Sequence, residues 1–248
     1  KQGGLYIFTP TITAANSSWY RGTADAIYQN LDWLKKSHEP YVVIASGDAV
    51  YKMDYNKVLE YHIDKKADIT VVCKDMPKGT DVSRFGVLST DEDGRILDFE
   101  EKPVESQEST ISCGIYVIRR RQLIELIEKC AQEDRYDFVR DILIRYKNLK
   151  RIFAYRISEY WNSVSSVESY YETNMDFLKA DVRKYFFKTY PDVYSKVLDL
   201  PPAKYNPGAD VRNSLVSSGC IINGAVENSI LFKKVFVGNN CVIKNSII

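Results

Sequence analysis

Apolar runs of strand length alternate with segments of helical periodicity from the start of the chain to about Tyr155. The predicted strands are residues 41–46, 69–73 and 112–118. The predicted helices are residues 23–37, 55–65 and 122–130. Residues 85–89 and 96–100 flank a turn at 91–94 and are predicted to pair as a hairpin. Alternation of strands and helices is typical of βαβ units, so we expect an α/β domain with a mostly parallel sheet.

A second region, residues 164–197, is rich in tyrosine, phenylalanine and charge and is predicted to be mainly helical. The buried stripe expected from its periodicity is Val167, Tyr170, Tyr171, Asn174 and Phe177. Its tyrosines suit helix packing or a subunit interface better than a glucan-stacking surface. Two breaks follow, at Pro201-Pro202 and Pro207-Gly208, and they predict a linker.

The third region is periodic, with six-residue units that start at residues 216, 222, 231, 237 and 243. The first and fifth places are apolar in every unit, which is typical of a parallel β-helix built from hexapeptides. An antiparallel hairpin with loose alternation is the alternative. The pattern continues to Ile248, so we expect the sequence to be part of a longer polypeptide. The predicted parts are residues 1–198, a linker at 199–209 and an incomplete β-helix at 210–248.

Composition narrows the function classes. The 34 Lys and Arg residues nearly balance the 33 Asp and Glu residues, so no overall field favours nucleic acid or an anionic membrane. We find neither a signal peptide nor an apolar run of about 18 residues, and the five cysteines lack Cys-x-x-Cys spacing. These features predict a soluble, cytoplasmic protein. His38 and His62 are expected at the surface, because neither has a second ligand at a metal-like spacing.

Four polar segments lie close to predicted strand or helix ends, where open α/β sheets bind ligands. They are residues 19–26, 47–48, 100–103 and 112–116. A Gly-Thr pair at a helix start suits an anion, although most such pairs are only caps. Asp48 offers the oxygen ligand that Mg²⁺ prefers, but aspartate is also a common turn residue. Lys102 suits a phosphate and could equally belong to a solvated turn, and Ser112 is compatible with a plain core strand.

Together and in this order, the segments resemble the sugar-phosphate nucleotidyltransferases, and in particular the glucose-1-phosphate adenylyltransferases. The matching motifs are Trp-Tyr-Arg-Gly-Thr-Ala-Asp-Ala at 19–26, Gly-Asp-x-x-Tyr-Lys-Met-Asp-Tyr at 47–55, Phe-Gly-Val at 85–87, Glu-Lys-Pro at 101–103, Ser-x-Gly-Ile-Tyr at 112–116, Leu-Pro-Pro-Ala-Lys at 200–204 and Asn-Ser-Leu-Val-Ser at 213–217. The resemblance implies a Rossmann-like nucleotidyltransferase domain followed by a left-handed parallel β-helix. It also implies a reaction that joins ATP and glucose 1-phosphate into ADP-glucose and pyrophosphate.

Carried over residue by residue, the resemblance assigns three groups of residues. Asp48 is expected at Mg²⁺. Tyr20, Gly22 and Thr23 are expected beside the nucleotide. The residues expected at glucose 1-phosphate are Gly86, through its backbone, with Glu101, Lys102, Ser112 and Trp161.

The chain departs from the family pattern in two places. The Gly-rich loop that holds the triphosphate has no counterpart in the sequence, which starts Lys1-Gln2-Gly3-Gly4. Where catalytic members have Trp-Arg-Asp-Val-Gly-Thr, residues 161–166 are Trp-Asn-Ser-Val-Ser-Ser. Ser163 therefore replaces the second metal-binding aspartate, which predicts a rate lower by about 10²–10⁴. A neighbouring carboxylate such as Glu159 is a candidate substitute.

This pattern resembles the regulatory subunit that accompanies the catalytic subunit in some Gram-positive bacteria. We therefore expect a hetero-oligomer with a catalytic glucose-1-phosphate adenylyltransferase, in glycogen synthesis. The expected ligands are a nucleotide, glucose 1-phosphate or a phosphorylated effector, with weak or absent Mg²⁺ binding. Three alternatives stay open: an independently active enzyme, a sensor without catalysis, and an acyltransferase that would need a β-helix histidine which residues 210–248 lack.

Overall fold

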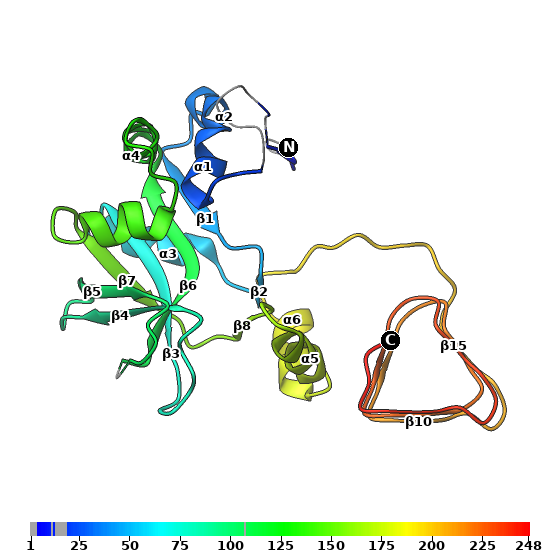
Figure 1. The fold of residues 1–248 in the computed structure, drawn as a ribbon. Coiled ribbons are helices and arrows are strands. Elements are labelled where there is room, and N and C mark those ends of the chain that lie inside the picture. Colours follow the sequence, from blue (N-terminus) through cyan, green and yellow to red (C-terminus); the bar gives the residue numbers. More distant parts are fainter. Residues whose placement is uncertain (1–3, 11, 13–18, 107) are drawn as a thin grey trace. The chain divides into compact units, whose positions relative to one another are not determined.

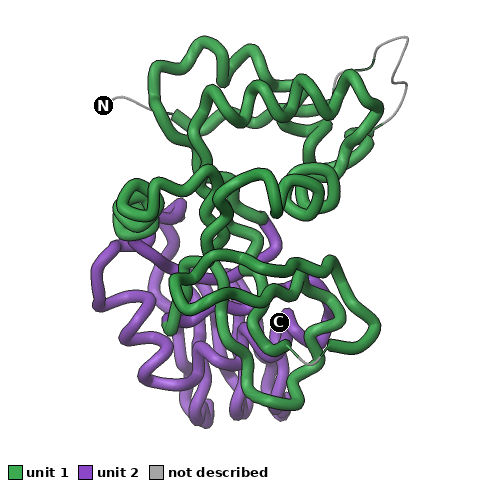
Figure 2. The backbone as a smooth tube through the Cα atoms, turned by 90° about the vertical axis from the view of Figure 1, so that its left-hand side faces the viewer, with its two compact units in different colours: residues 1–46, 55–158 green, residues 47–54, 159–248 purple. Residues whose placement is uncertain are grey.

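The computed structural model describes residues 4–10, 12, 19–106 and 108–248. The chain divides into two compact units (Figure 2). Unit 1 contains residues 1–46 and 55–158, and unit 2 contains residues 47–54 and 159–248. In the described residues, no helix is long and apolar enough to cross a membrane.

A mixed sheet forms the centre of unit 1 (Figure 1). Its strands are β1 (Tyr41–Ala45), β3 (Ile69–Asp75), β4 (Gly86–Thr90), β5 (Ile96–Glu101), β6 (Thr110–Arg119) and β7 (Ile152–Arg156). Strand β6 is antiparallel to both β1 and β3, and β3 is parallel to β7. Strands β1, β3 and β7 therefore run in one direction. The predicted hairpin is confirmed as β4–β5, which joins β6 through the pair Val87 and Ile111.

The helices of unit 1 cover this sheet and complete its core. They are α1 (Thr23–Tyr28), α2 (Leu31–Lys36), α3 (Tyr55–Asp64), α4 (Arg120–Gln132) and the π-helix η1 (Val139–Ile144). Helix α4 packs with α1 and α2, and α3 packs on β3. The prediction of one helix at 23–37 was wrong, because the chain leaves helical geometry at Asn30 (φ −112°, ψ 15°). The Asn30 amide donates to the carbonyl of Ala26 at 2.8 Å, a local bond that competes with helix continuation.

His62 is buried with 1% of its surface exposed, so the prediction of a surface histidine was wrong. It lies on the same face of α3 as Val58, one helical turn earlier, and that face covers the sheet. Its Nδ1 lies 2.8 Å from the Thr70 hydroxyl, and its ring meets Tyr41 edge to face. Burial lowers the pKa of His62 to about 4, and the charge of Arg119 acts in the same direction. His38 is exposed, as predicted.

Unit 2 begins with a small antiparallel pair, β2 (Ala49–Tyr51) and β8 (Trp161–Ser163), followed by helices α5 (Val167–Asp176) and α6 (Ala180–Lys188). The predicted buried stripe was wrong, since Val167 is 81% exposed and both Tyr170 and Tyr171 are exposed. Ser166 caps α5 with a reciprocal capping box, and this starting point turns Thr173 inward instead.

The rest of unit 2 is a parallel β-helix whose coils have a triangular outline (Figure 1). Its strands are β9 (Lys204–Tyr205), β10 (Asp210–Arg212), β11 (Leu215–Val216), β12 (Ile221–Ile222), β13 (Ala225–Glu227), β14 (Ile230–Leu231), β15 (Phe236–Val237) and β16 (Val242–Lys244). First-place residues of the predicted units, including Ile222, Leu231 and Val237, form its core. Strand β9 pairs with β12, so the β-helix begins inside the predicted linker at 199–209. Strand β9 has only two residues and therefore fits between Pro202 and Pro207. The two proline-containing breaks do not exclude a strand of this length, although they predicted a linker.

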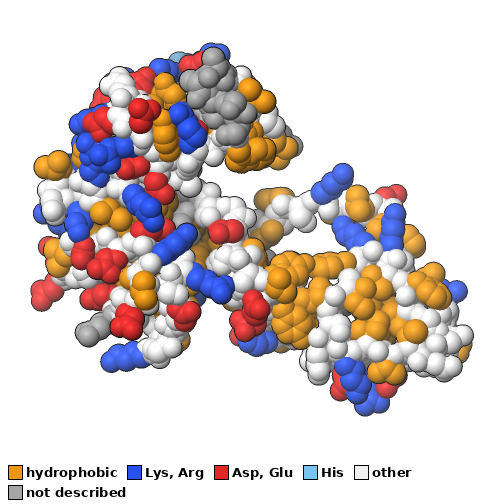
Figure 3. Space-filling view, in the orientation of Figure 1, with side chains coloured by type: hydrophobic (Ala, Val, Ile, Leu, Met, Phe, Trp, Pro, Cys, Tyr) orange, Lys and Arg blue, Asp and Glu red, His pale blue; other side chains and the backbone are white. Residues whose placement is uncertain are grey.

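Asn-Ser pairs form a stacked corner of the β-helix. Asn213, Asn228 and Asn245 have positive φ angles of 41°, 46° and 48°, a conformation that asparagine tolerates better than most residues. The backbone N–H of Ser229 donates to the Ser214 hydroxyl, and that of Ser246 donates to the Ser229 hydroxyl, both at 3.1 Å. The coils are therefore joined by side chains as well as by strand pairing. Phe236 and Val242 are exposed. Figure 3 shows hydrophobic side chains on the surface of the β-helix.

Candidate functional site

Three of the predicted sugar-phosphate residues meet on neighbouring strands of unit 1. Gly86 pairs with Glu101 across β4 and β5. The antiparallel pair Val87 and Ile111 places Gly86 and Ser112 at the next register position. A Cβ atom at Gly86 would lie 2.7 Å from the Phe99 ring and 3.1 Å from Glu101 Oε2. Glycine therefore leaves the room that the Glu101 carboxylate occupies.

Glu101 and Lys102 combine a desolvated carboxylate with an accessible ammonium group. Burial raises the pKa of Glu101, and the positive charge of Lys102, with its Nζ 3.9 Å from Glu101 Oε1, opposes this shift. Lys102 has a φ of +51°, a left-handed conformation that is uncommon for lysine, and its side chain is 62% exposed. Such backbone strain often occurs at binding sites. The pair suits a sugar hydroxyl group beside a phosphate.

Three residues that were missed as functional candidates act on this carboxylate: Tyr116, Asp137 and Arg140. The Tyr116 hydroxyl lies 3.5 Å from the Ser112 hydroxyl, and burial raises the pKa of Tyr116 to about 12. The charges of Asp137 and Arg140 act on Glu101, the first raising and the second lowering its pKa. Tyr116 is the last residue of the Ser-x-Gly-Ile-Tyr motif at 112–116, and that motif could have indicated it as a candidate. Asp137 stands just before the π-helix, and no periodicity indicated it.

The residues predicted beside the nucleotide have structural partners in unit 1. A Cβ at Gly22 would lie 2.3 Å from the Tyr136 carbonyl oxygen, so only glycine fits there. We expected Thr23 to cap α1, but its side chain does not do so. Its hydroxyl instead accepts the backbone N–H of Phe138 at 2.9 Å. The Tyr20 hydroxyl donates to the carbonyl of Phe8 at 3.3 Å. Gly22 and Thr23 thus hold the segment that contains Asp137, and nucleotide contact by these residues stays a prediction.

The predicted metal residues belong to unit 2. Ala49 pairs with Ser163, and the backbone N–H of Val164 donates to the Asp48 carbonyl at 2.7 Å. The backbone of Asp48 therefore lies opposite Val164, one register step from the Ala49–Ser163 pair, and a shared role of Asp48 and Ser163 at a metal ion stays a prediction. Asp48 is exposed and Ser163 is only 6% exposed. Asp48 and Ser163 together offer one carboxylate. One carboxylate fits a Mg²⁺ ion that is held mainly by water and substrate phosphates, but it does not fit an ion that is held by two carboxylates of the protein.

The residues beside Ser163 are anchored to helix α5. Trp161 is buried and pairs with Tyr51 of β2. The Asn162 amide donates to the Thr173 hydroxyl at 2.8 Å. In the position where catalytic members carry an arginine, this chain therefore has a neutral amide that fastens β8 to α5.

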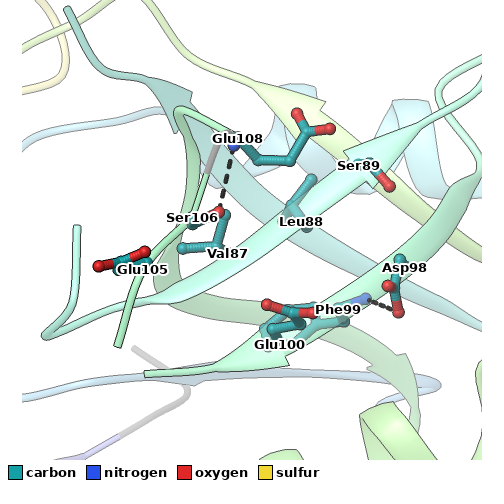
Figure 4. Close-up of a pocket in the computed structure, with 9 residues that line it drawn as sticks. All are labelled: Val87, Leu88, Ser89, Asp98, Phe99, Glu100, Glu105, Ser106 and Glu108. Atoms are coloured by element: carbon teal, nitrogen blue, oxygen red, sulfur yellow. Dashed lines mark hydrogen bonds between the residues drawn. The ribbon is translucent and has the colours of Figure 1, made fainter. Parts of the chain in front are cut away.

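Neither a clustered metal site nor the hollow on the β4–β5 hairpin adds a candidate in the part of the chain that the structure describes. The described residues contain no group of three or more histidine, cysteine or acidic side chains arranged to hold a metal ion. A hollow of about 270 Å³ on the β4–β5 hairpin is lined by Asp98, Glu100, Glu105 and Glu108 among others (Figure 4). It contains none of the predicted site residues, and its four carboxylates disfavour a phosphate.

Comparison with known proteins places these residues in a family. Residues 3–180 match the family described as "Nucleotidyl transferase". The chain belongs to the nucleotidyl transferase family. Residues 201–248 match the family described as "GlmU-like, C-terminal hexapeptide". The predicted fold class, an α/β nucleotidyltransferase domain followed by a hexapeptide β-helix, is thereby confirmed.

The curated relatives confirm the resemblance. The chain is 36% identical over 248 residues to a glucose-1-phosphate adenylyltransferase of Geobacillus stearothermophilus, covering 98% of this chain and 64% of the relative. It is 38% identical to that of Thermosipho africanus (98% and 60%) and 39% identical to that of Clostridium acetobutylicum (97% and 64%). The chain therefore spans about three-fifths of the length of these relatives.

Proposed function

We propose that this nucleotidyl transferase is a cytoplasmic regulatory subunit of glucose-1-phosphate adenylyltransferase in glycogen synthesis, weakly active or inactive by itself. The observation that carries the proposal is Ser163, which stands beside Asp48 where a second carboxylate is needed. Phosphoryl transfer of this kind depends on positioning and charge neutralisation rather than on a protein nucleophile. Bound Mg²⁺ would supply part of that neutralisation, and among residues 48–51 and 161–164 Asp48 is the one carboxylate that could hold it.

The sugar-phosphate residues support a retained binding role. Glu101, Lys102, Ser112 and Gly86 are all present, and their strands bring three of them together. A chain that has lost one metal ligand but keeps this set is suited to bind glucose 1-phosphate or a phosphorylated effector. The catalytic subunit of the hetero-oligomer would then carry out the reaction.

The test is ADP-glucose formation by the complete polypeptide, alone and titrated with the catalytic subunit of the same organism. No activity alone, together with a changed rate or substrate affinity in the mixture, supports the proposal. Ser163→Asp should raise the rate of the chain alone by about 10²–10⁴. Ser165→Asp is the matched control, since it adds the same charge at an exposed neighbouring position. Because Ser163 is buried, the melting temperature of both variants must be compared with that of the parent.

The second candidate is an independently active adenylyltransferase. It is favoured by the names of the relatives and by the complete Glu-Lys-Pro motif at 101–103. Substantial activity of the chain alone, unchanged by Ser163→Asp, would establish it and refute the regulatory proposal. A sensor without catalysis would bind nucleotide sugar equally well with and without Mg²⁺ in calorimetry.

A further inference from the structure

Lys52 is a buried lysine that none of the roles above uses. It follows β2 directly, and only 5% of its surface is exposed. Its Nζ lies 2.7 Å from the Thr189 carbonyl oxygen, 3.1 Å from the Thr189 hydroxyl and 3.3 Å from the Phe186 carbonyl oxygen. It also donates to the carbonyl of Tyr185. All these acceptors belong to the last turn of α6 and to the residue that ends it.

The chemistry of a helix end explains why a cation is buried there. The last carbonyl groups of a helix lack partners within the helix and carry partial negative charge. Residues 185–190 read Tyr-Phe-Phe-Lys-Thr-Tyr, so no glycine is available to close the helix with a left-handed turn. The ammonium group of Lys52 supplies the missing donors and lies 4.8 Å from the centre of the Tyr185 ring.

The contact is reciprocal, because the Tyr185 hydroxyl donates to the carbonyl of Lys52. Side chain and backbone of Lys52 are therefore both bound to α6. Strand β2 has three residues and, among the described strands, pairs with β8 alone. Asp48 stands immediately before this strand, and its carbonyl closes the end of the same pair through Val164.

We infer that Lys52 is a positioning residue that fastens β2 to the C-terminus of α6 and thereby sets where Asp48 stands relative to Ser163. Thr189 also opens the segment that leads to the β-helix, so a displacement of that segment would reach Asp48 through Lys52. Any effect of Lys52 on the binding of a metal ion or nucleotide at Asp48 rests on the proposed function. The connection of β2 to α6 through Lys52 does not. A lysine that merely capped α6 would leave β2 unaffected by its removal.

Hydrogen–deuterium exchange on the full chain tests this inference without any activity assay. Lys52→Met keeps the stem of the side chain and removes the donors, so exchange of residues 49–51 and 162–164 should rise at least about tenfold together with that of residues 185–190. Lys52→Arg keeps charge and donors and should restore slow exchange. Lys184→Met is the matched control, because Lys184 is exposed on the same helix. Residues 69–75 of unit 1 report global unfolding.

Faster exchange of residues 185–190 alone would overturn the inference, since it would show a local cap. Equal effects of Lys52→Met and Lys52→Arg would overturn it as well. If Lys52→Met also accelerates residues 69–75, Tyr185→Phe, which removes only the hydroxyl bond to the Lys52 carbonyl, replaces it, and unchanged exchange of residues 49–51 in that variant would overturn the inference. The rate of ADP-glucose formation by the unsubstituted chain mixed with the catalytic subunit is measured separately. If the chain does not change that rate, the proposed function is refuted, whereas the result of the exchange experiment still stands.

Discussion

Protonation of His62 should make the fold sensitive to mild acid. The ring is 1% exposed, its Nδ1 is engaged by Thr70, and its Nε2 has no hydrogen-bond partner among the described groups. Burial lowers the pKa of His62 from 6.5 to about 4, with Arg119 adding to the shift and Asp68 opposing it. The unfolded chain therefore takes up the proton first as the pH falls. The stability that neutral His62 contributes is complete above about pH 7 and declines until about pH 4.

The magnitude follows from the two pKa values of His62. A shift from 6.5 to about 4 corresponds to about 3 kcal/mol over the whole range, of which about 2 kcal/mol is lost between pH 7.5 and pH 5. Urea unfolding followed by circular dichroism at these two pH values measures the loss. His62→Gln should remove about 2 kcal/mol of the pH-dependent part, whereas His38→Gln, at an exposed position, should leave it unchanged.

Equal pH dependence in the parent and in His62→Gln would refute this reasoning. A pKa of His62 near 6.5, measured by NMR titration of the folded chain, would refute it directly.

Three further substitutions test other parts of the structure. Gly22→Ala should lower the free energy of unfolding by about 1–3 kcal/mol, because its Cβ would lie 2.3 Å from the Tyr136 carbonyl oxygen. Chemical denaturation measures the loss, with Gly47→Ala as the control because a Cβ at Gly47 meets no atom within 4 Å. Equal stability of the two variants would contradict this expectation. Ser229→Ala should cost about 1–3 kcal/mol by leaving the N–H of Ser246 without its acceptor, and a melting temperature equal to that of the parent would count against the stacked corner. Lys102→Gln should weaken binding of glucose 1-phosphate about tenfold or more in calorimetry, and unchanged affinity would remove Lys102 from the phosphate site.

Local pattern was sufficient for most strands of the unit 1 sheet and for the repeat of the β-helix, but not for the helix break at Asn30 or the buried face of α5. Alternating apolar runs predicted β1, β3, β6 and the β4–β5 hairpin, because each has a period visible within a few residues. The hexapeptide period predicted the β-helix in the same way. Replacement of an aspartate by Ser163 is equally a property of the sequence alone, and the structure adds that Ser163 lies across from Ala49.

Tertiary structure alone decided which partners the remaining polar residues find. His62 is buried because its helical face meets β1 and β3, whereas the charged residues Glu60 and Asp64 close to it in the sequence suggested a surface position. Thr23 bonds to Phe138, 115 residues away, and Lys52 bonds to Tyr185, 133 residues away. No short-range period encodes such contacts, since they arise only when distant elements pack. The sequence thus determined these strands, the hexapeptide repeat and the serine at position 163, while packing determined which polar side chains hold the fold together and which remain available for a ligand.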